Sequence, residues 1–486
     1  MILKKLIMYS VIVLFSTITF AQKKQPNLLI IHTDEHNYRT LGCYRDIMSE
    51  EQAFIWGKDV CVKTPNIDQL AKKGALCSSF YAASPVCTPS RASFISGLYP
   101  IATGSYKNDL PLNDGLVTFA EVLKKQGYAT TYVGKWHLDG DAKPGFEPAR
   151  KFGFDDNRYM FNRGHYKGME EKAEGPGFKG KFNKKKKTYF YDVTTATDES
   201  FTTDFLANRT IDAIKRDKNK PFCIMVSIPD PHGPNKVRPP YDTMYTHLNF
   251  KKPHSLTENL ISAPEWNAFT KKSVKELDQH SMAQYFGMVK CIDDNVGKIM
   301  DVLKQEGLDQ NTIVVFTSDH GDLMGEHARH NKGLPYETSA GIPFIMKYPG
   351  KVKGSKLINT AYTTADFAPT ILSMMGVKDG WPKFHGKDMS DAFLNKEKVV
   401  SNTDRIVYIT NAASRWVAAA NQRYKLVLSP NDSPWLFDLE KDPNELINFY
   451  NKRGYKEISE RFLKELKKQM QEFDEPLFKL GTIRYK

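Results

Sequence analysis

The chain has 486 residues, of which 41% are hydrophobic and 26% are charged, and its formal net charge is +13. This length and balance indicate an ordinary globular protein rather than a disordered chain, with room for one large α/β domain and a smaller one. The basic excess favours polyanionic partners, but charge alone leaves nucleic acid, anionic polysaccharide and mere solubility open.

The N-terminus has the pattern of a cleaved signal peptide. Lys4 and Lys5 precede an apolar run over residues 6–20, and Ala21 and Gln22 follow it. The run is short for a membrane span, which leaves an uncleaved anchor as the weaker alternative. We therefore predict a signal peptide at 1–21, a periplasmic or secreted protein and no stable membrane insertion. Export also argues against a nucleic-acid partner.

Predicted strands and helices alternate along most of the chain. A buried strand at 26–35 is followed by a helix that starts at Asn66 and that Gly74 ends. Helix–strand pairs follow at 115–138 and 200–234. The series continues with a long helix, a strand and a strand–helix pair, at 277–306, 311–322 and 341–376. This alternation predicts an α/β fold with a large, mostly parallel sheet sandwiched by helices.

Polar side chains directly follow several of these predicted strands. In open parallel sheets, ligands gather beyond the carboxyl ends of the strands. Seven acids, lysines and histidines occupy such positions although they span nearly the whole chain: Asp34, Glu35, Lys135, His137, His232, Asp319 and His320. We therefore predict that they share one site at this edge of the sheet.

The pattern changes after about Lys378, where short antiparallel strands and a closing amphipathic helix are predicted. We accordingly predict a main domain at 22–377 and a smaller C-terminal antiparallel-sheet subdomain of α+β type at 378–486. The stretch 142–198, rich in lysine, glycine and aromatic residues, is typical of a long insertion.

Cys87 stands in the unusual sequence Cys-Thr-Pro-Ser-Arg. A disulfide would not require Pro89, Ser90 and Arg91 beside it. A structural zinc site would require a second cysteine two to four residues away, whereas the nearest other cysteine is Cys77. The surroundings therefore predict chemistry at Cys87 itself.

This segment, with Gly97 further on, resembles the Cys-x-Pro-Ser-Arg signature of the formylglycine-dependent type I sulfatases of the alkaline-phosphatase-like superfamily. Other segments resemble the same family and extend the likeness over nearly the whole mature chain: GKWHL, PDPHGP, TSDHGDLMGEH and LFDLEKDPNEL. The resemblance implies an alkaline-phosphatase-like fold and a sulfatase of the secreted bacterial polysaccharide type.

The resemblance also implies that a formylglycine-generating maturation enzyme oxidises Cys87 to an aldehyde during export. The hydrated aldehyde has two hydroxyls, of which one attacks sulfur and the other then drives sulfate release. A thiol or a serine could perform only the first half of this reaction. The implied metal is Ca²⁺, with Mg²⁺ as the other candidate, bound by oxygen-rich ligands. Its implied ligands, among which Glu35 is the less common choice, are Asp34, Glu35, Cys87, Asp319 and His320.

The remaining site residues receive roles from the same resemblance. Lys135, Lys332 and Arg91 would surround the sulfate and the charge that develops on it. His137 would act as the base on the second hydroxyl, and His232 as the acid to the leaving alcohol.

Export, the basic balance and the aromatic-rich insertion favour a sulfated polysaccharide, or its oligosaccharides, as the substrate. Two alternatives stay open at this point. One is a phosphonate or phosphodiester hydrolase of the same fold, and the other is a non-catalytic binder of sulfated glycans.

Overall fold

The computed structural model describes residues 25–183, 188–257, 263–269, 273–412, 415–477 and 483. The signal peptide predicted at 1–21 lies outside the described residues. Within the described part of the chain, every helix is too short or too polar to cross a membrane.

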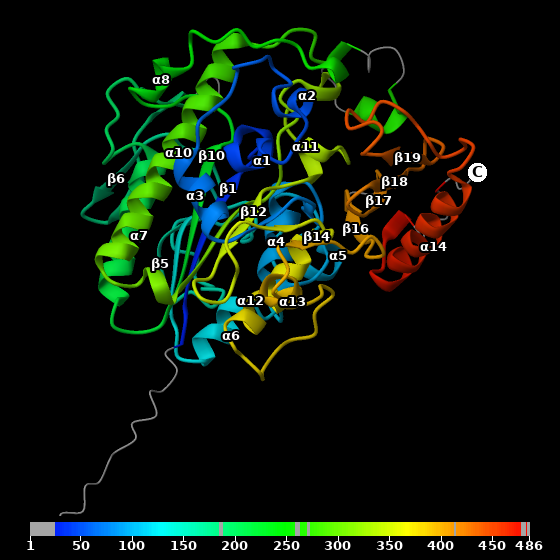
Figure 1. The fold of residues 1–486 in the computed structure, drawn as a ribbon. Coiled ribbons are helices and arrows are strands. Elements are labelled where there is room, and N and C mark those ends of the chain that lie inside the picture. Colours follow the sequence, from blue (N-terminus) through cyan, green and yellow to red (C-terminus); the bar gives the residue numbers. More distant parts are fainter. Residues whose placement is uncertain are drawn as a thin grey trace, which may run out of the picture.

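A nine-stranded sheet forms the centre of the larger domain (Figure 1). Strand β12 is antiparallel to both its neighbours, β11 and β2, and the other pairs are parallel. This confirms the predicted large, mostly parallel sheet. Its strands, in spatial order, are β15 (Val399–Val400), β13 (Lys356–Ile358), β2 (Ala75–Cys77), β12 (Phe344–Lys347), β11 (Thr312–Ser318), β1 (Asn27–Asp34), β10 (Phe222–Pro231), β4 (Ala129–Lys135) and β5 (Asp156–Phe161).

Helices cover both faces of this sheet because successive side chains of its buried strands point to opposite sides. In β1, Leu29 and Ile31 face the layer formed by α3 (Pro65–Lys73), α7 (Thr202–Asp217) and α10 (Gln279–Gln305). Leu28 and Ile30 face the opposite layer. That layer consists of α4 (Cys87–Ser96), α6 (Phe119–Lys125), α12 (Phe367–Met374) and α13 (Ser390–Leu394).

A four-stranded antiparallel sheet forms the smaller C-terminal part, as predicted. It contains β16 (Val407–Thr410), β17 (Val417–Ala420), β18 (Tyr424–Leu428) and β19 (Trp435–Asp438), in that spatial order. The closing helix α14 (Lys456–Glu472) packs on one face through Phe462, Leu466 and Met470. The other face packs against residues of the larger domain, among them Leu334 and Tyr336.

The boundary between the two predicted domains, 377/378, stays a prediction. Beyond it, β15 still pairs with β13 at the outer edge of the large sheet, and Phe393 of α13 belongs to that sheet's core. The short elements that connect the larger ones are α1 (Gly42–Arg45), α2 (Glu50–Ala53), β3 (Phe80–Tyr81), α5 (Pro100–Thr103), α8 (Tyr241–Met244), α11 (Glu337–Ala340) and β14 (Tyr362–Thr363).

The predicted long insertion at 142–198 requires a correction. Its segment Asp156–Phe161 is the edge strand β5, which pairs with β4 and so belongs to the main sheet. Only the part after β5 forms separate hairpins, made of β6 (Met169–Lys172) with β7 (Gly175–Phe178) and of β8 (Lys181–Asn183) with β9 (Thr188–Phe190).

Candidate active site

Four neighbouring parallel strands deliver polar side chains to one edge of the sheet. In the order β11, β1, β10 and β4, the strands end next to one another. Asp34 is the last residue of β1 and Lys135 the last of β4, while His232 follows β10 and Asp319 follows β11. All four are thus held by buried strands, as the position of these residue types in the sequence predicted.

Cys87 reaches the same edge of the sheet from a helix, since it is the first residue of α4. It is buried, and Arg91 lies one helical turn further on, so both side chains project from the same face of the helix. Gly97 ends the helix with a φ of +70°, and a Cβ there would come within 2.4 Å of the Phe384 ring. The sequence Cys87–Gly97 therefore sets both the start and the end of the helix that carries the thiol.

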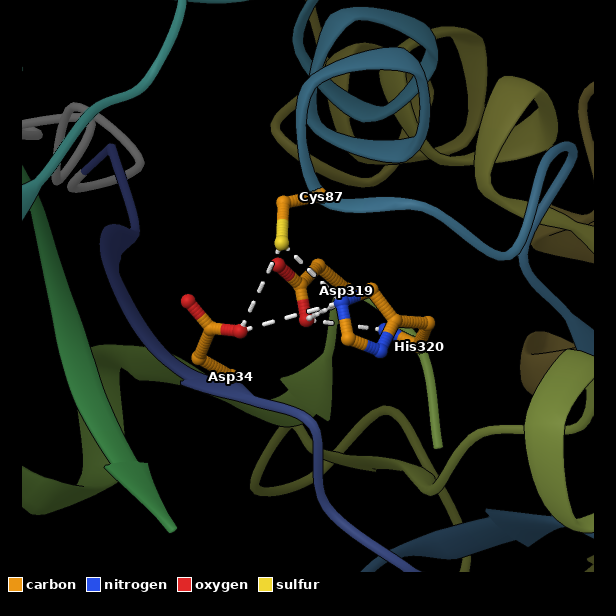
Figure 2. Close-up of side chains that lie close together, drawn as sticks. All are labelled: Asp34, Cys87, Asp319 and His320. Carbon is orange, nitrogen blue, oxygen red and sulfur yellow. Dashed lines mark hydrogen bonds and ion pairs between the residues drawn. The ribbon is translucent and has the colours of Figure 1, made fainter. Parts of the chain in front are cut away.

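The thiol, two carboxylates and an imidazole converge on a single point (Figure 2). One candidate ligand atom from each of Asp34, Cys87, Asp319 and His320 lies within 4.8 Å of the others. The Cys87 Sγ is 3.2 Å from His320 Nε2 and 3.8 Å from Asp34 Oδ1. His320 Nδ1 donates to the carbonyl oxygen of Gly321 over 3.0 Å, so that Nε2 is the nitrogen that faces the cluster.

This cluster has the charge and donor chemistry of a cation site. Asp34 Oδ2 is held by Arg91 at 3.2 Å and by Lys135, so that Oδ1 is the oxygen left toward the cluster. Burial alone would lower the pKa of His320, but the Asp319 carboxylate raises it to about 9, so the cluster stabilises a positive charge. Two carboxylate oxygens and one imidazole nitrogen fit a divalent metal ion.

Glu35 lies beside this cluster rather than in it. Its carboxylate pairs with His232 Nε2 at 2.9 Å and with Lys332 Nζ at 3.5 Å. Its backbone N–H, at a φ of 63°, donates to Asp319 Oδ1 over 3.1 Å. Burial would raise the pKa of Glu35, but His232 and Lys332 lower it to about 2. The metal-ligand role of Glu35 stays a prediction.

Arg91 forms ion pairs with both Asp34 and Asp319 and so holds them at the ends of β1 and β11. Its Nε donates to Asp319 Oδ2 over 2.8 Å, and its Nη1 donates to the Lys135 carbonyl over 2.9 Å and to Ser227 Oγ over 2.7 Å. Burial and the nearby Asp34 carboxylate would raise the pKa of Asp319, but His320 and Arg91 lower it to about 2. Both aspartates are therefore ionised at neutral pH, since burial is likewise outweighed at Asp34, mainly by Lys135.

Two lysines place positive charge at the thiol. Lys332 Nζ donates to Cys87 Sγ over 3.1 Å, and Lys135 forms a buried ion pair with Asp34. Burial alone would raise the pKa of the Cys87 thiol, but Lys135 and Lys332 hold it well below its usual range. An anion at this position is therefore strongly stabilised, whatever its chemical nature.

The two histidines with predicted acid–base roles differ in their contacts. His232 pairs with Glu35, and its ring stacks on His165 with centroids 3.5 Å apart. His137 Nε2 lies 3.0 Å from Asp109 Oδ1, and its buried Nδ1 has no hydrogen-bond partner among the described residues. Within the described residues, the His137 side chain makes no hydrogen bond or ion pair with the cluster of Figure 2. The Thr88 hydroxyl, next to Cys87, donates to the His137 carbonyl over 2.9 Å.

Sequence reasoning missed His165 and Asp109. His165 Nε2 lies 2.7 Å from Lys135 Nζ and 3.5 Å from Asp34 Oδ2, inside the same charge network. Burial and Lys135 hold the pKa of His165 well below 6.5, so the ring is neutral. The sequence does contain a signal for His165, because polar residues that follow parallel strands share one edge of the sheet and His165 follows β5. The interpretation of residues 142–198 as an insertion overlooked β5 and therefore His165.

The chain matches the family model described as Sulfatase over residues 26–377 and therefore belongs to the sulfatase family. A second model, described as N-sulphoglucosamine sulphohydrolase, C-terminal, matches residues 325–472. The homologues include named sulfatases, and the chain is accordingly an enzyme of the sulfuric ester hydrolase class.

Two curated relatives and one solved structure illustrate the likeness. The ulvan-active sulfatase of Formosa agariphila is 29% identical over 92% of this chain and 81% of its own length. The N-acetylglucosamine-6-O-sulfatase of Bacteroides thetaiotaomicron is 24% identical over 93% of this chain and 88% of its own. The structure of BT4656 with its substrate D-glucosamine-2-N,6-O-disulfate has a TM-score of 0.76 at 21% identity, covering 93% of this chain and 99% of that chain. At this identity the structural match shows the shared fold.

Proposed function

We propose that the protein is an exported sulfatase that removes sulfate from a sulfated polysaccharide or its oligosaccharides, with a formylglycine made from Cys87 by a maturation enzyme. The observation that carries this proposal is the placement of Cys87. Cys87 is the first residue of the buried helix α4. Its side chain faces the candidate cation site with its two carboxylates and accepts a hydrogen bond from Lys332. The names of the ulvan-active and N-acetylglucosamine-6-O-sulfatase relatives support a glycan substrate.

Two groups complete the proposed site after synthesis of the chain: the formylglycine at position 87 and a bound divalent metal ion. The formylglycine hydrate supplies one hydroxyl that attacks sulfur and a second that drives sulfate release, and a bound Ca²⁺ or Mg²⁺ supplies Lewis-acid polarisation of sulfate oxygen. Asp34, Asp319 and His320 would hold the metal ion together with residue 87, and Glu35 is the remaining candidate ligand.

The chain's own cations would bind the sulfate group. Lys332 already contacts the side chain of residue 87, and Lys135 lies behind Asp34 in a fully buried position. Arg91 contributes positive charge at the same point while its hydrogen bonds fix Asp34 and Asp319. Such preorganised charges stabilise the transition state because they need no reorientation during the reaction.

The histidines would move protons. Asp109 holds Nε2 of His137, which leaves the unpartnered Nδ1 free to accept a proton from the second hydroxyl of residue 87. His232 would act as the acid to the leaving alcohol through Nε2, and the proton on this nitrogen, which faces the Glu35 carboxylate in this structure, would turn to the alcohol oxygen when the substrate is bound. The Gly233 carbonyl, 2.9 Å from Nδ1, orients the ring. Lys167 donates to the carbonyl of His232 over 3.1 Å and pairs with buried Asp230, so this histidine is fixed from the backbone as well.

The test is sulfate release by protein co-expressed with a formylglycine-generating enzyme. We expect turnover of sulfated oligosaccharides to exceed that of a small aryl sulfate, and Cys87→Ser to abolish it. Cys61→Ser, a substitution of a half-buried cysteine elsewhere, is the matched control and should retain full activity. Faster turnover of an aryl phosphonate than of any sulfate ester would favour the phosphonate hydrolase instead. Glycan binding without any turnover would favour the non-catalytic binder.

Metal dependence is tested separately. Removing divalent ions with a chelator should stop turnover and lower the unfolding temperature, because Asp34 and Asp319 are then left as close, buried carboxylates. Adding Ca²⁺ should restore both. Chelation without effect on either quantity would contradict the proposed metal site.

A further inference from the structure

Lys332 is held differently from the other predicted cations of the site. Lys135 is the last residue of β4 and Arg91 lies inside α4, so regular elements set their positions. Lys332 lies in the connection of residues 319–336 between β11 and α11, outside every strand and helix. Its position therefore depends on contacts between this connection and the rest of the molecule.

The backbone of this connection is strained. Four of its non-glycine residues have φ values between 43° and 63°, a region that residues other than glycine rarely adopt: Met324, His327, Ala328 and Asn331. Gly333, directly after Lys332, has a φ of 92°, and a Cβ there would meet no atom within 4 Å, so conformation rather than space requires glycine. Such conformations persist only where surrounding contacts enforce them. The connection thus relies on its neighbours to keep Lys332 in place.

Two side chains of the C-terminal sheet bind the carbonyl that directly follows Lys332. Trp416 Nε1 donates to the Gly333 carbonyl over 3.0 Å, and Asn411 Nδ2 donates to the same oxygen over 3.3 Å. Asn411 follows β16, Trp416 precedes β17, and both are buried. The Asn411 N–H also donates to the Trp416 carbonyl over 3.1 Å, so the sheet fixes the two donors relative to each other.

The same end of the C-terminal sheet contacts the segment before Cys87. The N–H of Thr410, the last residue of β16, donates to the Ala83 carbonyl over 2.9 Å. Figure 1 shows β16 and β17 next to α4, the helix that Cys87 begins. One sheet therefore holds the chain on both sides of the hydrogen bond of 3.1 Å between Lys332 Nζ and Cys87 Sγ.

The residue before Lys332 is fixed within the larger domain. The Asn331 N–H donates to Asp322 Oδ1 over 2.9 Å, and the Asn331 carbonyl accepts from the Leu323 N–H over 2.8 Å. Lys332 is thus anchored on both sides, and the anchor on its C-terminal side is the one that the C-terminal sheet supplies.

From these contacts we infer that Trp416 and Asn411 are positioning residues, which hold Lys332 against residue 87 through the Gly333 carbonyl. The inference rests on the proposed role of Lys332 in binding the sulfate group, and it adds that the C-terminal sheet takes part in catalysis through residues that need not touch the substrate. A fixed charge stabilises the transition state only while its distance and direction are maintained. A loosened Gly333 carbonyl would therefore lower the contribution of Lys332 without removing the lysine.

A double-mutant cycle with Lys332 tests this inference. The paired substitution Trp416→Phe/Asn411→Leu removes both N–H donors and keeps buried side chains of similar size. For two lost hydrogen bonds of ordinary strength, we expect kcat on an aryl sulfate, per aldehyde at residue 87, to fall about 10- to 100-fold. In the Lys332→Met background the same pair should change kcat less than about twofold, because the side chain that it positions is already gone.

Trp435→Phe is the matched control, since it makes the same substitution in β19 of the same sheet and should leave kcat unchanged in both backgrounds. The single variants Trp416→Phe and Asn411→Leu, taken through the same cycle, keep the test decisive if the pair does not fold. Each should lower kcat about three- to tenfold, again only in the presence of Lys332.

An unchanged kcat in these variants, or an equal loss in both backgrounds, would overturn the inference. Equal losses would show that the two residues stabilise the fold without acting through Lys332. Absence of sulfate release by the enzyme that carries the otherwise unaltered sequence would instead contradict the proposed function itself.

Discussion

Lys332→Met removes one positive charge from the reacting residue while keeping a side chain of similar length. Lys332 Nζ lies 3.1 Å from Sγ of Cys87, and at an effective dielectric constant of about 20 a unit charge pair at this distance interacts by about 5 kcal/mol. The lysine side chain is 15% exposed, so water can replace part of this interaction. Loss of one preorganised donor typically costs about 2.7–4 kcal/mol in the transition state. We therefore expect kcat to fall about 100- to 1,000-fold.

The assay is the initial rate of sulfate release from an aryl sulfate, normalised to the aldehyde content of residue 87 measured by mass spectrometry. This normalisation separates a catalytic defect from incomplete maturation. Lys125→Met removes the same charge from an exposed position on α6 and is the matched control. A normalised kcat of Lys332→Met within tenfold of the wild type, with an unchanged control, would refute the idea that this lysine stabilises charge at residue 87.

Three further predictions concern the neighbours of the site and the contact between domains. His165→Ala removes the ring that stacks on His232 and contacts Lys135, and should lower kcat about 10- to 100-fold with little change in the urea midpoint; unchanged kinetics would contradict its positioning role. Lys425→Met leaves buried Glu445 and half-buried Glu337 without their shared cation and should lower the free energy of unfolding by about 3–5 kcal/mol. An unaltered urea midpoint would show that the cluster does not stabilise the domain contact. The pKa of Glu35 is lowered from 4.5 to about 2, so the ionised carboxylate stabilises the fold by about 3 kcal/mol above pH 4.5, and this stabilisation is lost as the pH falls toward 2. In protein treated with a chelator, the difference in unfolding free energy between wild type and Glu35→Gln should therefore shrink over this pH range. A difference that does not change with pH would refute the assignment.

The sequence predicted the main sheet because its strands are buried on both faces and end in polar residues. Asp34, Lys135, His232 and Asp319 could be placed at one edge, since parallel strands share the direction in which they end. The helix that carries Cys87 was also predictable, from Pro89 in its first turn and Gly97 at its end.

Other features could not be predicted because they depend on pairing across the fold. β5 is a six-residue edge strand whose first half, Asp-Asn-Arg, is polar, so its place beside β4 was missed, and His165 with it. The position of Glu35 beside the cluster depends on its φ of 63° and on ion pairs with His232 and Lys332 from distant segments.

Joint measurement of chemical state and activity in one series of preparations tests the central claim most directly. Protein produced with graded amounts of the maturation enzyme would be analysed by mass spectrometry for the fraction of aldehyde at residue 87 and, in parallel, for sulfate release. Our account predicts that activity rises in proportion to that fraction and extrapolates to zero for the unmodified thiol. Full sulfate release by protein that carries only the thiol would contradict it.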